Sequence, residues 1–179
     1  IKLVSIDVPL TQVHRIVKDQ EANGTLSEFL KMCMELEDEV EWWDKDHYKG
    51  ERFVKKTHIT MRFWQETTQS EMKDQFMSLL GASVEIKATA LLWDETVAAL
   101  EVIIPEATMD GRALPASNNE FVHITIWVAK DAKASMSNRL PDRWKKGEAQ
   151  RVEFAAPITT FGSISFWDFE NNPIPAEEN

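Results

Sequence analysis

The chain has 179 residues with a net charge of −10 and a pI near 4.9, and 43% of its residues are hydrophobic. These values are typical of one globular domain, and the net negative charge argues against non-specific binding along a nucleic-acid backbone. Cys33 is the only cysteine, which excludes a disulfide within the chain, and no apolar run approaches the ~20 residues of a membrane span.

The first part of the chain predicts a strand followed by two helices. Residues 3–8 form an apolar run typical of a strand. Apolar spacing over 13–17 predicts a short helix in which His14 is expected at the surface or at a boundary. A capping box of Thr25 and Glu28 predicts a longer helix that reaches Val40. An acidic face and an aromatic-rich loop, residues 42–48, then follow.

The rest of the chain mixes strands and helices. The patterns predict a strand over 57–64, a helix between the Thr68–Glu71 capping box and Gly81, a hairpin of 84–92 and 97–104, a loop over 105–120, a strand over 121–128, a partly helical 133–144 interrupted by Pro141, and strands at 152–154 and 163–169. The order strand, helix, strand, strand thus occurs twice. We therefore expect an α+β fold of two pseudo-symmetric lobes of antiparallel sheet, with outer helices and a central cleft.

One four-residue motif occurs in two of these predicted strands. Residues 58–61 read His-Ile-Thr-Met and residues 123–126 read His-Ile-Thr-Ile. Because side chains alternate along a strand, His58 and Thr60 share one face, and so do His123 and Thr125. The chain has four histidines, so two such copies are hard to attribute to chance. Two facing pairs of this kind make an acid–base site with hydroxyls that hold an anion.

The same alternation predicts two substrate-binding side chains. Arg62 is expected on the His58 face, where it would neutralise a phosphate; a surface arginine at a strand end is the alternative. Trp127 is expected on the His123 face, where it would stack on a base; packing at the core edge is the alternative. No cluster of His, Cys and carboxylates has the spacing of metal ligands, so we expect no metal and no cofactor.

The two motifs resemble those of the two-histidine (2H) phosphoesterase superfamily. Further segments are similar to the 2′,3′-cyclic phosphodiesterase domain of fungal and plant tRNA ligases: Leu92-Trp93-Asp94 before residues 97–104, Ser137-Asn138-Arg139-Leu140, Pro157-Ile158 and Ser163-Ile164-Ser165-Phe166. The resemblance covers residues 1–169, which we expect to form a single two-lobed domain, with 170–179 as a C-terminal tail.

The resemblance implies a reaction and a set of roles. The substrate would be an RNA end with a 2′,3′-cyclic phosphate, such as a tRNA exon half, opened by water to a 2′-phosphate without a metal. His58 would be the acid, His123 the base, and Thr60 and Thr125 would bind the phosphate. Ser137 and Asn138 would line the cleft, although a helical cap explains that dipeptide equally well.

The resemblance also implies a wider context. We expect kinase and ligase domains linked to this one in a longer chain. The first residue, Ile1, is not Met, which agrees with that expectation. A single cysteine suits a reducing compartment, so an intracellular location, cytoplasmic or nuclear, is expected. Two alternatives stay open: a 2H enzyme of another branch that acts on a different phosphodiester, and a non-catalytic module that binds RNA ends.

Overall fold

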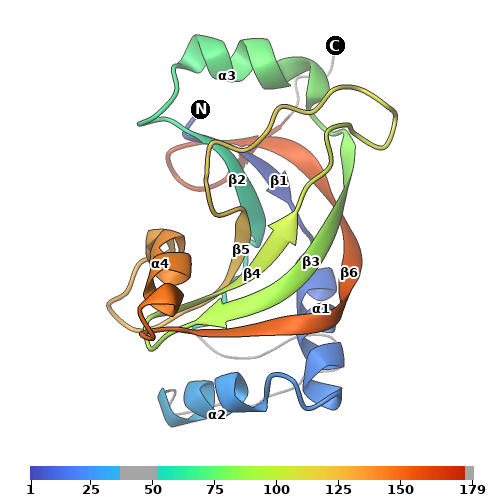
Figure 1. Ribbon diagram of the computed structural model, residues 1–179. Helices are drawn as coiled ribbons and strands as arrows, with labels where there is room; N and C mark the ends of the chain where they lie inside the picture. The colour runs from blue at the N-terminus through green and yellow to red at the C-terminus, as the bar shows by residue number, and fades with distance from the viewer. Residues whose placement is uncertain (37–51, 176–179) are drawn as a thin grey trace.

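The computed structural model describes residues 1–36 and 52–175 and has an α+β fold (Figure 1). The aromatic-rich loop and the end of the predicted second helix lie outside the described residues. The elements are β1 (Leu3–Asp7), α1 (Leu10–Ala22), α2 (Ser27–Leu36), β2 (His58–Phe63), α3 (Gln69–Phe76), η1 (Met77–Leu79), β3 (Ser83–Trp93), β4 (Val97–Ile103), β5 (His123–Val128), η2 (Ala134–Arg139), α4 (Leu140–Lys145), β6 (Gln150–Trp167) and β7 (Pro173–Ile174).

The strands form one antiparallel sheet that closes on itself. Their order is β1-β2-β5-β4-β3-β6-β7, and β6 also pairs with β1, so six strands make a closed ring. The predicted α+β class is confirmed. The division into two pseudo-symmetric lobes is not, because the described strands belong to a single continuous sheet.

β6 closes this ring because it is long enough to pair with two strands. Its 18 residues follow β3 and then β1, where the sequence predicted two separate strands. The prediction left out residues 155–162. Pro157 lies in this part of β6, in a stretch, residues 154–157, that has no register partner on β3. A proline is tolerated there because no ladder hydrogen bond is lost. Gly162 sits at the closure, where a Cβ atom would lie 2.7 Å from the carbonyl oxygen of Asp7.

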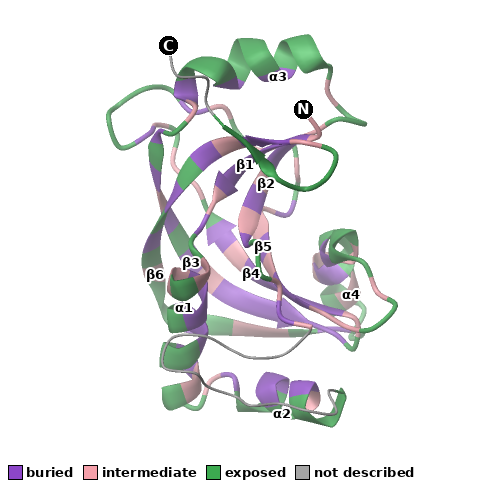
Figure 2. Ribbon diagram, turned by 180° about the vertical axis from the view of Figure 1, so that it is seen from behind, coloured by how far each residue is buried: buried purple, intermediate pink, exposed green. Residues whose placement is uncertain are grey.

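The helices cover the ends and one face of the sheet. α1 and α2 lie at one end of the molecule and α3 at the other, and their buried sides face the strands (Figures 1 and 2). The main core joins them to the inner strand residues, and a smaller cluster, including Ala99, Phe121 and Leu140, lies beneath η2 and α4. His14 is 2% exposed and packs edge-on against Phe53, so the prediction of a surface or boundary histidine is wrong.

Local sequence signals account for the helix that follows the first motif. Thr68 and Glu71 form both hydrogen bonds of the predicted capping box at the start of α3. Gly81, with φ +79°, ends the helical segment after η1, as glycine at a helix C-terminus commonly does. Met72 and Phe76 are buried on the side of α3 that packs toward β2.

Candidate active site

The sheet places the two motif strands side by side. β2 and β5 are antiparallel neighbours, with Ile59 paired to Ile124, and both isoleucines are fully buried in the main core. The antiparallel register then sets His58 beside Thr125 and Thr60 beside His123 on the opposite face. The four side chains that were expected to act together therefore form one cluster.

The two histidines are held in the same way. The Nδ1 atom of His58 lies 3.1 Å from the carbonyl oxygen of Lys56, and that of His123 lies 2.7 Å from the carbonyl oxygen of Phe121. A carbonyl oxygen only accepts, so Nδ1 carries the proton and donates it in both rings. Nε2 is left in each case as the nitrogen that can accept or release a proton, and no described residue hydrogen-bonds to it.

Aromatic neighbours set the orientation of each imidazole. The ring of His58 lies 4.6 Å from that of Trp167, and His123 stacks on Phe121 at 4.8 Å with an angle of 15° between the rings. These contacts also shield the imidazoles from water in part, and both histidines are half-buried. Burial therefore lowers the pKa of both histidines below the ordinary value.

Charges distinguish the two histidines. The Asp7 carboxylate counteracts burial by raising the pKa of His58, while the more weakly acting Lys2 lowers it. Within residues 1–36 and 52–175, no carboxylate raises the pKa of His123, and His58 lowers that pKa further. A proton on the pair is therefore held better by His58.

Asp7 reaches this position through β1. It is the cross-strand partner of His58, and its Oδ1 atom accepts hydrogen bonds from Ser5 Oγ at 2.6 Å and Trp167 Nε1 at 2.9 Å. Glu101 on β4 is the corresponding partner of His123. The sequence analysis missed both acids, because strand alternation gives the face of a side chain but not which strand lies next to it.

The two threonines differ in their partners. Thr125 Oγ1 lies 2.9 Å from Ser137 Oγ, and Ser137, which belongs to η2, is completely buried. The Thr60 hydroxyl has no hydrogen bond to any described residue, although its carbonyl oxygen accepts one from Ser117. Asn138 is exposed and donates to the Ser135 carbonyl oxygen. Of the predicted Ser137-Asn138 pair, only the serine contacts the motif residues.

A β-bulge turns Arg62 away from the histidines. Thr60 pairs with Ser5 and Arg62 with Val4, so Met61 is an extra residue on β2. Since cross-strand partners point to the same face, Arg62 lies on the core face. The prediction that it shares the face of the first motif histidine is wrong, because it assumed uninterrupted alternation.

Arg62 connects β2 to the elements around it instead. It is 7% exposed, and its Nε atom donates to Gln75 Oε1 at 3.0 Å. One of its Nη atoms donates to the carbonyl oxygens of Met61 at 2.8 Å and Ala116 at 2.6 Å, and the guanidinium lies over the Phe76 ring. These contacts use the guanidinium to join β2 to α3 and to the loop after β4.

The second motif strand has a bulge at the same place. Thr125 pairs with Ala99 and Trp127 with Ala98, which leaves Ile126 as the extra residue. Trp127 is consequently 0% exposed and packs edge-on against Phe29 of α2. The prediction of a base-stacking Trp127 is wrong, and the alternative of a core position holds.

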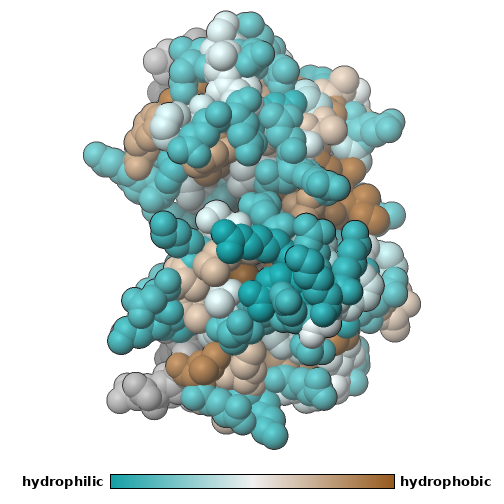
Figure 3. Space-filling view, turned by 60° about the vertical axis from the view of Figure 1, so that its left-hand side comes forward, coloured by the Kyte–Doolittle hydropathy of each residue, from teal (hydrophilic) through white to brown (hydrophobic). Residues whose placement is uncertain are grey.

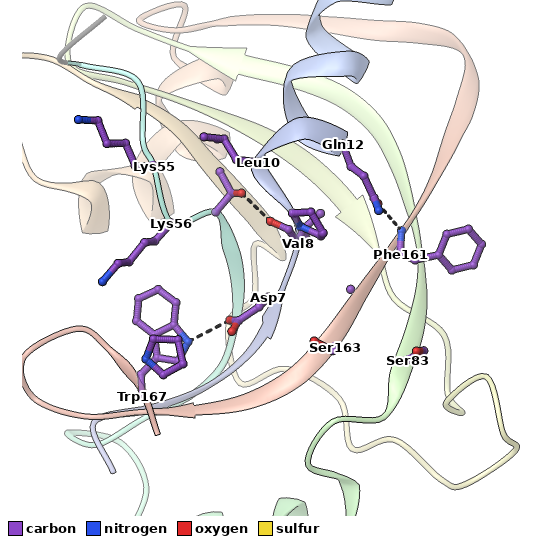
Figure 4. A pocket seen from close by; sticks show the side chains of 14 residues that line it. Asp7, Val8, Leu10, Gln12, Lys55, Lys56, Ser83, Phe161, Ser163 and Trp167 are labelled. Carbon is purple, nitrogen blue, oxygen red and sulfur yellow. Dashed lines mark hydrogen bonds between the residues drawn. The ribbon is translucent and has the colours of Figure 1, made fainter. Parts of the chain in front are cut away.

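A pocket of about 530 Å³ adjoins the His58 side of the cluster. Asp7, Lys56 and Trp167 line it, and the indole of Trp167 donates to Asp7 (Figure 4). None of the four motif side chains lines it. The pocket therefore lies next to the histidine pair, behind the residues that orient His58, rather than between the two motifs.

Two further features bear on the kind of protein. Among residues 1–36 and 52–175, no group of three or more His, Cys, Asp or Glu side chains is arranged to hold a metal ion, and the metal-free reaction stays a prediction. No helix in the described part of the chain is long and apolar enough to cross a membrane.

The fold and the paired motifs define a cyclic phosphodiesterase domain of the 2H phosphoesterase type. Residues 4–162 match the fungal tRNA ligase phosphodiesterase domain, and the chain belongs to that family. It is similar to tRNA ligase 1 of Arabidopsis thaliana, with 25% identity over 169 residues, which cover 93% of this chain and 14% of that protein. The chain thus spans about a seventh of this relative.

A solved structure supports the fold alone. The crystal structure of a fungal RNA kinase superposes with a TM-score of 0.60 at 12% sequence identity. The similarity covers 90% of this chain and 45% of that one.

Replacing Arg62 tests its position on the core face. Arg62→Met removes the hydrogen bonds to Gln75, Met61 and Ala116 and leaves the buried carbonyl oxygen of Met61 without its partner, which costs ~1–3 kcal/mol. The Tm should fall by ~3–10 °C, while KM for RNA with a cyclic phosphate end changes less than about twofold. Arg15→Met, at an exposed arginine of α1, is the control and should leave Tm nearly unchanged. An unchanged Tm with a large rise in KM would contradict the assignment.

Proposed function

We propose that this domain hydrolyses RNA 2′,3′-cyclic phosphate ends to 2′-phosphate, 3′-hydroxyl ends, without a metal. The reaction would be the end-healing step of tRNA splicing, a role that membership of the tRNA ligase phosphodiesterase family supports. The observation that carries the proposal is the single face shared by His58, Thr60, His123 and Thr125 on adjacent strands.

The arrangement suits a displacement at phosphorus with one acid and one base. Nε2 of neutral His123 accepts a proton from water, and the water oxygen forms a bond to phosphorus. The bond from phosphorus to O3′ breaks, and Nε2–H of protonated His58 donates its proton to the leaving oxygen. Each such proton transfer typically contributes ~10²–10⁴-fold to the rate.

The roles follow from the surroundings of each ring. Asp7 favours the protonated form of His58, and no carboxylate in the described part of the chain does the same for His123. His58 is therefore assigned as the acid and His123 as the base. After turnover the proton is on His123, and exchange with solvent restores the starting state.

The threonines bind the non-bridging phosphate oxygens. The Thr60 hydroxyl has no partner among the described residues and is free to donate to the phosphate. Thr125 can accept from Ser137 Oγ while its own proton points to the phosphate. Ser137 thereby positions Thr125, and hydrogen bonds that strengthen as charge grows on the oxygens stabilise the transition state.

The wider context is proposed on the same basis. Residues 1–169 act as the catalytic unit and 170–179 as a tail, with kinase and ligase domains on the same longer chain and an intracellular site of action, cytoplasmic or nuclear. The alternative is a 2H phosphodiesterase of another branch, which acts on a different RNA or nucleotide phosphodiester.

Product mapping tests the reaction. An oligoribonucleotide that ends in a 2′,3′-cyclic phosphate should be opened in excess chelator, and a phosphatase that spares 2′-phosphates should leave the product intact. Release of phosphate by that enzyme would identify a 3′-phosphate and favour the alternative branch. Activity that disappears in chelator and returns with a divalent cation would contradict the metal-free reaction.

The pH profile tests the two roles. The active free enzyme needs protonated His58 and neutral His123, and both pKa values lie below the ordinary 6.5. The value of kcat/KM should therefore peak below about pH 6.5 and fall toward neutral pH as His58 loses its proton. Asp7→Asn removes the charge that favours protonated His58, so the falling limb should move to lower pH and activity at pH 7 should drop severalfold.

The rising limb, which belongs to His123, should stay in place in that variant. Asp74→Asn, at an exposed carboxylate on α3, is the control and should reproduce the wild-type profile. A shift of the rising limb instead of the falling one would reverse the assignment of acid and base.

A further inference from the structure

Residues 130–151 are basic in an otherwise acidic chain. They contain seven of the 20 Lys and Arg residues but three of the 30 Asp and Glu residues, while the whole chain has a net charge of −10. The basic residues are Lys130, Lys133, Arg139, Arg143, Lys145, Lys146 and Arg151. They belong to η2, α4, the loops beside them and the start of β6.

Most of these charges are available to a partner. Arg143 pairs with Asp94 and Glu95, and Arg151 pairs with Glu101. The other five are exposed and make no ion pair with the described residues: Lys130, Lys133, Arg139, Lys145 and Lys146. On the face that turns α4 toward the viewer, strongly hydrophilic side chains gather in the middle of the molecule (Figure 3).

This basic surface adjoins the histidine cluster. Ser137, in the middle of η2, is the residue that hydrogen-bonds to Thr125. Arg139 ends the same short helix, and α4 continues directly from it. The exposed cations of η2 and α4 are thus joined to the candidate site by the hydrogen bond between Ser137 and Thr125.

Trp144 provides an aromatic surface among these charges. It is 45% exposed, and the guanidinium of Arg151 lies 5.4 Å from the centre of its ring. Arg151 donates to Glu101 at 3.0 Å, and Glu101 is the cross-strand partner of His123. Glu101 and Arg151 therefore connect the strand position beside His123 to an indole that is partly open to solvent.

We propose that η2 and α4 bind the single-stranded RNA that leads to the cyclic phosphate, with a base stacked on Trp144. Arg139, Lys145 and Lys146 contact the phosphates of that strand. A flat aromatic ring beside exposed cations is the usual composition of a single-strand binding groove. An acidic peptide would use the charges but has no need of the indole. The inference rests on the proposed function and extends it to the substrate strand.

Binding to a product-ended RNA tests the proposal independently of turnover. The probe is a fluorescent single-stranded oligoribonucleotide of roughly eight nucleotides with a 2′-phosphate end, a length within the range of known single-strand sites. Trp144→Ala should raise Kd by about 5- to 100-fold, and Trp144→Phe should keep most of the affinity. Trp64→Ala, at an indole of similar exposure beside Phe169, is the matched control and should bind as the wild type does.

The salt dependence of Kd tests the charges. Replacing both Lys145 and Lys146 by alanine should reduce the slope of log K against log salt by about 1.4, because each contact with single-stranded phosphate contributes about 0.7. Lys73→Ala with Lys87→Ala, two exposed lysines elsewhere, should leave the slope unchanged.

Three outcomes would overturn the inference: an unchanged Kd in Trp144→Ala, an unchanged slope in the double lysine variant, or competition by oligoglutamate as effective as competition by RNA. The first two would leave the proposed hydrolysis intact if oligonucleotide ends are still opened. Trp144→Ala should lower kcat/KM for the oligonucleotide more than for a cyclic mononucleotide, which has no upstream strand. Equal loss on the mononucleotide and the oligonucleotide would place Trp144 in the reaction site and contradict strand binding.

Discussion

Ile59 of β2 and Ile124 of β5 form the cross-strand pair that holds the two motif strands together. With both isoleucines in the core, a shift of one residue would exchange their faces with those of the histidines and bury the wrong side chains. The register is therefore specified by hydrophobic burial, and the position of each histidine follows from it. The bulges at Met61 and Ile126 then end the alternation, so that each strand contributes one His-Thr pair and returns to the core.

The chemical character of the site comes from what surrounds this pair of strands. Aromatic rings shield both imidazoles from water in part, and Asp7 makes the two unequal because it raises the pKa of His58 alone. The basic surface of η2 and α4 adjoins Thr125, to which it is joined by the hydrogen bond that Ser137 makes. In the proposed mechanism, different elements thus supply the acid–base chemistry and the binding of the RNA strand. A chain of net charge −10 can bind RNA in this way because it needs positive charge only near the site.

The sequence alone predicted the motifs, their strands and the α3 capping box, because these depend on local pattern. It placed Arg62 and Trp127 on the wrong face, since a bulge is visible only once the partner strand is known. It also missed Asp7, for the same reason. The closed ring of strands depends on β6 pairing with both β3 and β1, which no local pattern specifies.

The central claim is that His58 donates a proton to the leaving O3′ and His123 removes one from water. Hydrolysis by His58→Ala and His123→Ala should be compared on a normal cyclic end and on one with sulfur in place of O3′, a better leaving group. The account predicts that both variants lose most activity on the normal end and that sulfur rescues His58→Ala alone. Rescue of His123→Ala alone would reverse the roles, and near-wild-type activity of either variant on the normal end would contradict the two-histidine mechanism.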